Sequence, residues 1–123
     1  MENVALNAVK TYIQCASELN PVTRAAMLES CFAENGRMIT RSREIFGRAP
    51  ISEMISRFWA DPQSLRIRVV TEVDAIGKTF RFGSIVECRD GSVLYNFDAG
   101  EIDNDGRISL ILAFAGPLGE VVS

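Results

Sequence analysis

One acidic residue of this sequence occupies a position where a carboxylate is costly. Asp98 lies between Phe97 and Ala99, in a run, "VLYNFDAGEI", that otherwise has the composition of a β-strand. A buried carboxylate must be paired, hydrogen-bonded or protonated. Asp98 could accept bonds from a cation such as Arg81 on an adjacent strand and brace a sheet. It could equally supply an acid or hydrogen-bond donor to a cavity, and both interpretations stay open.

The chain contains no histidine. This absence excludes Ser-His-Asp and Cys-His nucleophile pairs, histidine-ligated zinc and a histidine general base. Any chemistry must use carboxylates, Tyr, Lys, Arg, Cys or backbone groups. Cys15, Cys31 and Cys88 are an odd number without a C-x-x-C pair, which indicates reduced, mostly buried thiols in a cytoplasmic protein.

The remaining charged clusters have simpler explanations. The sequence Asp-Asn-Asp-Gly at 103–106 predicts a hairpin turn. A calcium loop would need more oxygen ligands at alternating positions and a distal Glu, so we expect no metal ion and no cofactor. Arg41, Arg43 and Arg48 surround a loop that is either solvated or at the mouth of a pocket, where it would attract an anionic ligand.

Helical periodicity dominates the first half. A first apolar stripe at helical spacing comprises Val4, Ala5, Ala8, Val9, Tyr12, Ile13 and Ala16. Asn20-Pro21 restarts the chain as N-cap and first helical residue, and this second helix is expected to run to a stop near Asn35-Gly36. A short strand over 37–41 and a loop lead to a third helix. It opens at Pro50 and ends at Asp61-Pro62.

The second half alternates with a period of two residues. It predicts a strand over 65–73, a turn at Gly77-Lys78, the strand "TFRFGSIVEC", a hairpin at Asp90-Gly91, the strand that contains Asp98, and a last strand over 107–115. Helices followed by a long meander define an α+β class. We expect one domain over residues 1–123, with the helices packed on one face of a curved, mainly antiparallel sheet.

The last strand is apolar on both faces. Strict alternation places Ile108, Leu110, Leu112 and Phe114 on one face, and Ile111 and Ala113 on the other. Because helices can cover only one side of the sheet, the face with Leu110, Leu112 and Phe114 predicts a homodimer interface.

Bulk properties narrow the range of partners. A net charge of −3 gives no electrostatic footprint for nucleic acid or an anionic membrane. No apolar run approaches the roughly 20 residues of a membrane span, and "MENVALNAVK" lacks the pattern of a secretory signal. We therefore expect no nucleic-acid partner, no membrane partner and a cytoplasmic location.

The order of these elements resembles the nuclear transport factor 2-like superfamily. The resemblance also rests on "FGR" before the third helix, "FRF" on a central strand and the pattern D-x-x-x-x-D-x-D-G-R-I that begins at Asp98. It is closest to the bacterial SnoaL-like members, with ketosteroid isomerase as a relative. It implies a cone-shaped α+β domain, a homodimer, and a pocket between sheet and helices that binds a small apolar or polycyclic molecule.

The resemblance also implies roles for particular residues. Asp98 matches the position of a protonated carboxylic acid that donates a hydrogen bond to the substrate oxyanion, and Tyr12 matches a pocket tyrosine; these are the two candidate catalytic residues. We expect the ligand-binding residues to be Phe32, Met38, Phe58, Trp59, Phe80, Phe82, Ser84, Asn96, Ile111 and Ala113. If strand parity holds, Arg81 points away from this set, and burial raises the pKa of Asp98 above about 3.9.

Three chemistries of the superfamily depend on residues that this chain lacks. The usual general-base aspartate is absent from "MITRSRE", where Thr40 or Arg41 stands in its place. The scytalone dehydratase pattern needs histidines. The limonene epoxide hydrolase pattern needs an aspartate on the last strand, which here reads "RISLILAFAG".

Three classes of function remain after this comparison: an enzyme that acts on a small apolar molecule through Asp98 and Tyr12, a binding module without chemistry, and a dimerising interaction domain. The resemblance favours a SnoaL-like small-molecule-binding protein, of isomerase or polyketide-cyclase type if Asp98 acts as an acid. The alternative is a non-catalytic dimerising module for ligand binding or protein interaction.

Overall fold

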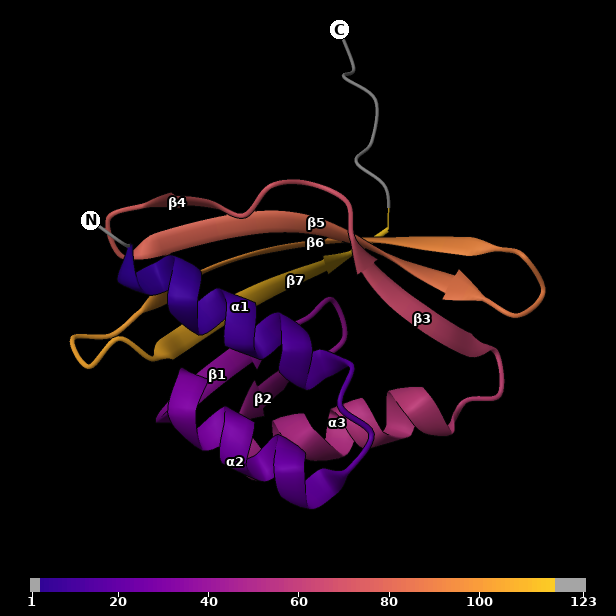
Figure 1. Ribbon diagram of the computed structural model, residues 1–123, viewed down its shortest axis with the longest axis horizontal. Coiled ribbons are helices and arrows are strands. Elements are labelled where there is room, and N and C mark those ends of the chain that lie inside the picture. The colour runs from indigo at the N-terminus through magenta and orange to yellow at the C-terminus, as the bar shows by residue number, and fades with distance from the viewer. Residues whose placement is uncertain (1–2, 117–123) are drawn as a thin grey trace, which may run out of the picture.

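The computed structural model of the protein describes residues 3–116 and consists of helices on one side of a curved sheet (Figure 1). The elements are α1 (Val4–Ala16), α2 (Pro21–Cys31), β1 (Phe32–Ile39), β2 (Glu44–Phe46), α3 (Arg48–Ala60), β3 (Ser64–Val69), β4 (Asp74–Ile76), β5 (Thr79–Cys88), β6 (Val93–Ile102) and β7 (Ile108–Ala115). The expected α+β class is confirmed, and the expected helices and strands occur in the expected order, but β2 and β4 are additional strands that the sequence analysis does not predict.

Asparagine side chains start the first two helices. Asn3 Oδ1 accepts a hydrogen bond of 2.8 Å from the backbone N–H of Ala5. Asn20 Oδ1 accepts bonds of 2.9 and 3.2 Å from Val22 and Thr23, and Pro21 occupies the first helical position as the sequence predicts. These caps satisfy N–H groups that have no partner inside the helix.

The segment after α2 differs from the prediction. Phe32 has φ −122° and ψ 134°, so the helix ends at Cys31 and not near Asn35-Gly36. The chain continues directly as β1, in which the Phe32 ring packs so tightly over Gly36 that a Cβ there would lie 2.5 Å from a ring carbon. β2, which was expected to be loop, pairs antiparallel with β1. The third helix begins at Arg48, two residues before Pro50.

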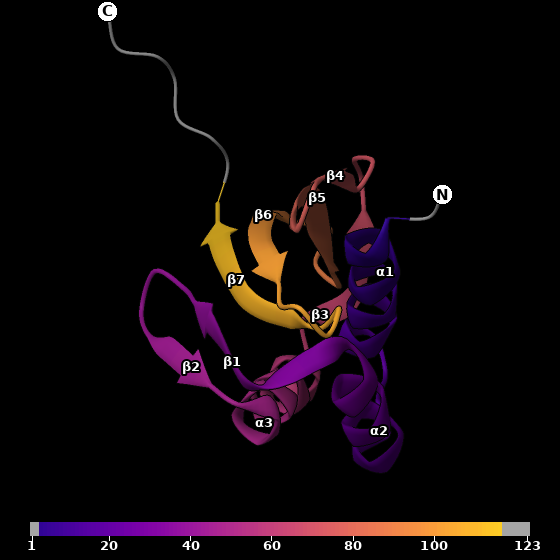
Figure 2. The same cartoon turned by 90° about the vertical axis from the view of Figure 1, so that its left-hand side faces the viewer.

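Within residues 3–116 the sheet has seven strands in the order β2-β1-β7-β6-β5-β3, and β4 pairs with β5. β1 runs parallel to β7, and the other neighbours are antiparallel. Figure 2 shows how β7 and β6 curve around the helices. The strand predicted over 65–73 ends at Val69, because the Thr71 hydroxyl takes the place of a backbone acceptor for the N–H of Gly83, at 2.7 Å.

A bulge changes the parity of the last strand. Ile102 pairs with Ile108 and Glu101 pairs with Leu110, which leaves Ser109 as the extra residue. Ile108 is consequently buried in the core, and the prediction that it shares the outer face with Leu110 is wrong. After the bulge, Leu110 and Leu112 still lie on the outer face, as the sequence predicts.

A buried arginine joins the three helices. Arg24 is 1% exposed, and its guanidinium donates to the carbonyl oxygens of Glu18 at 2.9 Å and Ser52 at 2.7 Å. It also donates to the Ser56 hydroxyl at 2.6 Å and to the carbonyl of Leu19 at 3.4 Å. The guanidinium thus ties the α1–α2 connection to α3 without a carboxylate partner.

Candidate functional site

A cavity of about 350 Å³ lies between the helices and the inner face of the sheet. This volume falls in the range of small-molecule sites. The lining residues are Tyr12, Ile13 and Ala16 from α1, Met38 and Thr40 from the β1 region, Met54, Ile55 and Phe58 from α3, Ile67 and Val69 from β3, Phe82, Ser84 and Val86 from β5, Leu94, Tyr95, Asn96 and Asp98 from β6, and Ala113 and Ala115 from β7. Most of them are apolar, so the few polar groups determine how a ligand would be oriented.

Asp98 is the one carboxyl group among the described residues that line this cavity. It is 7% exposed and pairs in the sheet with Phe82 on one side and Ala113 on the other. Asn96 Nδ2 donates a hydrogen bond of 2.9 Å to Asp98 Oδ1. Burial raises the pKa of Asp98 to about 6, and the Asn96 hydrogen bond partly opposes this shift.

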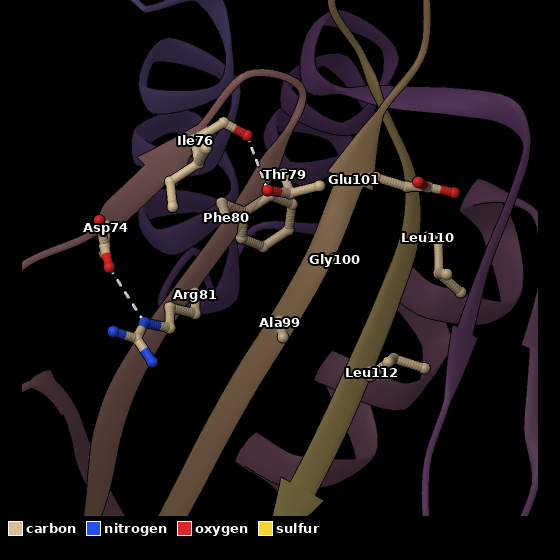
Figure 3. Close-up of a pocket in the computed structure, with 10 residues that line it drawn as sticks. All are labelled: Asp74, Ile76, Thr79, Phe80, Arg81, Ala99, Gly100, Glu101, Leu110 and Leu112. Carbon is tan, nitrogen blue, oxygen red and sulfur yellow. Dashed lines mark hydrogen bonds and ion pairs between the residues drawn. The ribbon is translucent and has the colours of Figure 1, made fainter.

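The ion pair that would make Asp98 a structural brace is not formed. Arg81 is opposite Ala99 in the sheet, one residue out of register with Asp98. Its guanidinium Nε binds Asp74 Oδ2 at 3.0 Å on the outer face, as Figure 3 shows. The parity expected from the sequence therefore holds, and Asp98 faces the cavity without a cation.

Two hydroxyl groups line the cavity with Asp98, that of Tyr12 from α1 and that of Ser84 from β5. Tyr12 is buried, and the pKa of its hydroxyl is raised well above 10 by burial first and by the charge of Asp98 second. Ser84 is 6% exposed and lies opposite Asn96 in the sheet. Within residues 3–116 neither hydroxyl has a hydrogen-bond partner. Every fully buried side-chain oxygen or nitrogen atom in these residues does have one, so these two hydroxyl oxygens are not fully buried. Both hydroxyls must therefore reach the open space of the cavity.

The structure brings together eight of the twelve residues predicted for the site. The lining includes Tyr12, Met38, Phe58, Phe82, Ser84, Asn96, Asp98 and Ala113. Four expected residues do not line it: Phe32, Trp59, Phe80 and Ile111.

These four side chains have other surroundings. Phe32 and Ile111 are sealed in the core, where the sheet and helices meet. Trp59 is partly buried, and its Nε1–H donates to the carbonyl of Ala16 at 2.8 Å. Phe80 packs on Phe82, with ring centroids 6.4 Å apart, and borders a second hollow described below.

Sequence reasoning missed several wall residues. Ile13, Ala16, Met54 and Ile55 belong to apolar helical stripes that periodicity identifies only as buried. Tyr95, near the start of β6, is a further wall residue. No sequence signal distinguishes a residue that faces a cavity from one that faces packed core.

The basic cluster does not line the cavity. Arg41 Nε donates to the carbonyl of Ala115 at 2.8 Å, and its guanidinium lies 5.9 Å from the centroid of the Phe114 ring. Arg48 Nε donates to the carbonyl of Phe32 at 2.7 Å. These two arginines therefore hold backbone segments together.

The acidic turn and the cysteines have structural surroundings. Asp103 Oδ1 accepts hydrogen bonds from the backbone N–H groups of Asp105 at 2.8 Å and Arg107 at 3.1 Å, as in a tight Asx turn. No group of three or more acidic or cysteine side chains in residues 3–116 could hold a metal ion. Burial raises the pKa of Cys15 to about 11 and that of Cys31 to about 12, so both thiols are protonated.

The outer face of the sheet carries a second, shallower hollow of about 570 Å³. Leu110 and Leu112 from β7 border it together with the Arg81–Asp74 ion pair (Figure 3). Phe114, farther along the same strand, is 43% exposed. No helix of the described residues is long and apolar enough to span a membrane.

No family model and no curated protein matches the sequence, but solved structures match the fold. A proposed isomerase of the SnoaL-like family from Agrobacterium tumefaciens C58 is 23% identical, with a TM-score of 0.82 over 93% of this chain and 98% of that one. A nuclear transport factor 2-like protein of unknown function from Burkholderia xenovorans LB400 is 12% identical, with a TM-score of 0.70 over 97% and 88%. An LEH-like epoxide hydrolase of Mycobacterium tuberculosis is 12% identical, with a TM-score of 0.65 over 91% and 82%.

Three helices on a curved sheet of this order, together with these neighbours, define a protein of the nuclear transport factor 2-like fold. The Agrobacterium protein, which is assigned to the SnoaL-like family, shares this fold over nearly the whole of both chains. Because one fold can host many activities, function must be argued from the cavity itself.

Proposed function

We propose that the chain binds a small, largely apolar molecule in the cavity and orients it by a hydrogen bond from Asp98 to a ligand oxygen. The observation that supports this most directly is a carboxyl group, 7% exposed, that faces an apolar cavity with Asn96 as its hydrogen-bond partner and no cation. Burial favours the neutral acid. A neutral carboxylic acid can donate a hydrogen bond to a carbonyl oxygen, whereas a carboxylate cannot.

The chemistry that fits this arrangement is enolisation, as in an isomerase or a polyketide cyclase. When a proton leaves the carbon beside a carbonyl group, the electron pair of the broken C–H bond forms a C=C bond and negative charge collects on oxygen. A donor fixed at that oxygen stabilises the transition state. Asp98 is the proposed donor. Tyr12 is the second candidate, since its hydroxyl reaches the same cavity.

Binding without catalysis is a second candidate, and one observation favours it. No other carboxyl group of the described residues lines the cavity. Thr40, one of the two residues expected in place of the usual general-base aspartate, lines it instead. Water would have to accept the proton in an enolisation. A binding module has no need of such a base.

Binding of 2-tetralone tests the proposed role of Asp98. Tetralin, which lacks the carbonyl oxygen, is the matched ligand, and both are titrated by calorimetry at pH 5. The wild-type protein should prefer 2-tetralone by about tenfold, the effect of one strong hydrogen bond. Asp98→Leu should abolish this preference, whereas Asp105→Asn on the exposed turn should retain it. Equal affinity of the wild-type protein for both molecules would refute the proposal.

A second measurement separates catalysis from binding. Exchange of the protons beside the carbonyl group of 2-tetralone is followed by NMR in heavy water. Acceleration by the wild-type protein and not by Asp98→Leu would support an enolising enzyme. Binding without acceleration would favour the non-catalytic module.

We also propose that the protein is a homodimer through the outer sheet face that carries Leu110, Leu112 and Phe114. Support comes from the position of the two leucines beside the outer hollow and from the exposure of Phe114. Soluble monomers rarely leave a contiguous apolar patch of this kind uncovered. Sedimentation of the wild-type protein tests it directly, and a monomer at micromolar concentration would refute it.

A further inference from the structure

Three polar residues of the cavity, Ser84, Asn96 and Asp98, form a row of neighbours on two adjacent strands. Ser84 on β5 is directly opposite Asn96 on β6, and Asp98 follows Asn96 on the same face of β6. Diagonal neighbours across antiparallel strands, such as Ser84 and Asp98, lie about 7 Å apart. On this wall of the cavity, Asn96 therefore lies between Ser84 and Asp98.

Asn96 is the member of this row whose amide is already occupied. Its Nδ2 donates to Asp98 Oδ1, so Oδ1 acts as the accepting oxygen of the carboxyl group. In the neutral acid the proton is then carried by Oδ2. Asn96 thereby leaves Oδ2 as the donor that Asp98 can offer to a ligand.

Ser84 is the member whose hydroxyl is uncommitted. Its side chain is buried, yet within residues 3–116 its hydroxyl makes no hydrogen bond, and it lines the cavity. Because this hydroxyl reaches the open space of the cavity, its donor and acceptor positions are available to a ligand. A ligand oxygen at this point would form a hydrogen bond with it.

The wall opposite this row is mostly apolar. Apart from Tyr12, the residues of α1 and α3 that line the cavity are apolar, and they include Ile13, Met54 and Phe58. A ligand between the two walls would have its polar groups along one edge and hydrocarbon along the other.

We infer that the cavity selects ligands that carry two oxygen functions on the same edge, about 7 Å apart. One oxygen accepts the hydrogen bond from Asp98, and the other bonds to the Ser84 hydroxyl. The inference rests on the proposed function, and it adds Ser84 as the residue that distinguishes doubly from singly oxygenated ligands.

Three related ketones test this inference. 7-Hydroxy-2-tetralone has its hydroxyl and carbonyl oxygens on one edge, at about the spacing of diagonal cross-strand neighbours. 6-Hydroxy-2-tetralone has the same groups on opposite edges, and 2-tetralone lacks the hydroxyl. Calorimetry at pH 5 should show that the 7-hydroxy compound binds about fivefold more tightly than each of the others, the effect of one neutral hydrogen bond.

Variants assign the effect to Ser84. Ser84→Ala should bind the three ketones with equal affinity and should bind 2-tetralone as tightly as the wild-type protein does. Ser30→Ala, on the exposed side of α2, should retain the preference.

The outcomes separate this inference from the proposed function. Tight binding of 2-tetralone without discrimination between the hydroxy isomers overturns the two-oxygen specificity and leaves the role of Asp98 intact. A preference for the 7-hydroxy isomer that persists in Ser84→Ala overturns the assignment to Ser84. Failure of all three ketones to bind overturns both proposals.

Discussion

If ligand binding requires the neutral form of Asp98, affinity must fall as pH rises. The carboxyl group of the free protein titrates near pH 6 because burial raises its pKa. At pH 5 about nine-tenths of the molecules then carry the proton, and at pH 7 only about one-tenth do. A ligand that binds only the protonated fraction loses affinity in the same proportion.

The expected change is therefore large. The Kd of 2-tetralone should increase about tenfold between pH 5 and pH 7 and about tenfold again by pH 8. Tyr12 cannot produce this effect, since the pKa of its hydroxyl lies well above 10. The ketone itself does not titrate in this range, so the change reports the protein.

Calorimetry in buffers of different ionisation enthalpy provides the assay. At pH 7 it should show uptake of about one proton for each ligand bound, and at pH 5 nearly none. Asp98→Asn supplies the control, because its amide cannot titrate, and its Kd should not change with pH. A wild-type affinity that is constant from pH 5 to pH 8 would refute the proposal that neutral Asp98 is the donor.

Four other predictions follow from the fold and the site. Burial raises the pKa of Asp98 from 3.8 to about 6, which destabilises the wild-type protein progressively as pH rises over that interval. Relative to the wild type, Asp98→Asn should therefore gain about 2 kcal/mol of unfolding free energy between pH 4 and pH 7 in urea titration, and no gain would mean that the carboxylate is stabilised in the folded state. Leu112→Asp should give monomer or aggregate in sedimentation, and an unchanged dimer would exclude this face. Gly100→Ala should cost about 3 kcal/mol in the same urea titration, because its Cβ would lie 2.0 Å from the Leu110 carbonyl oxygen; a smaller loss than that of an exposed Gly91→Ala would contradict this. Chelation with EDTA should leave the Tm unchanged, and a clear decrease would show that the Asp103 turn binds a cation.

The elements that could be predicted from sequence are those with strong local signals. The stripe of α1, the Asn20-Pro21 start of α2 and the alternation through β5 and β6 all depend on nearby residues. The end of α2 at Cys31 could not be predicted in this way, because Phe32 suits the buried face of a helix as well as that of a strand. Tertiary pairing of β1 with β7 resolves that ambiguity in favour of the strand.

The site shows the same division. Asp98 could be found because a carboxylate in an apolar strand is conspicuous, and Ser84 and Asn96 follow from strand parity. Parity states which face a residue occupies but not how deep it lies, so it predicts that Ile111 faces the pocket, whereas the structure seals this side chain in the core. The Ser109 bulge, which reverses the direction of Ile108, has no signal in the local sequence.

Arg24 gives the helical layer an attachment that acid cannot disrupt. Its acceptors are backbone carbonyls and the hydroxyls of Ser52 and Ser56, none of which gains a proton between pH 4 and pH 8. The ion pairs of the described residues, by contrast, lie on the surface, where each contributes little. The hydrogen bonds that Arg24 forms between the helices thus do not depend on pH in this range, whereas the Asp98 carboxyl group in the cavity does. A change of stability or affinity near pH 6 can therefore be attributed to Asp98 in the cavity, because the Arg24 contacts between the helices stay constant over the same pH range.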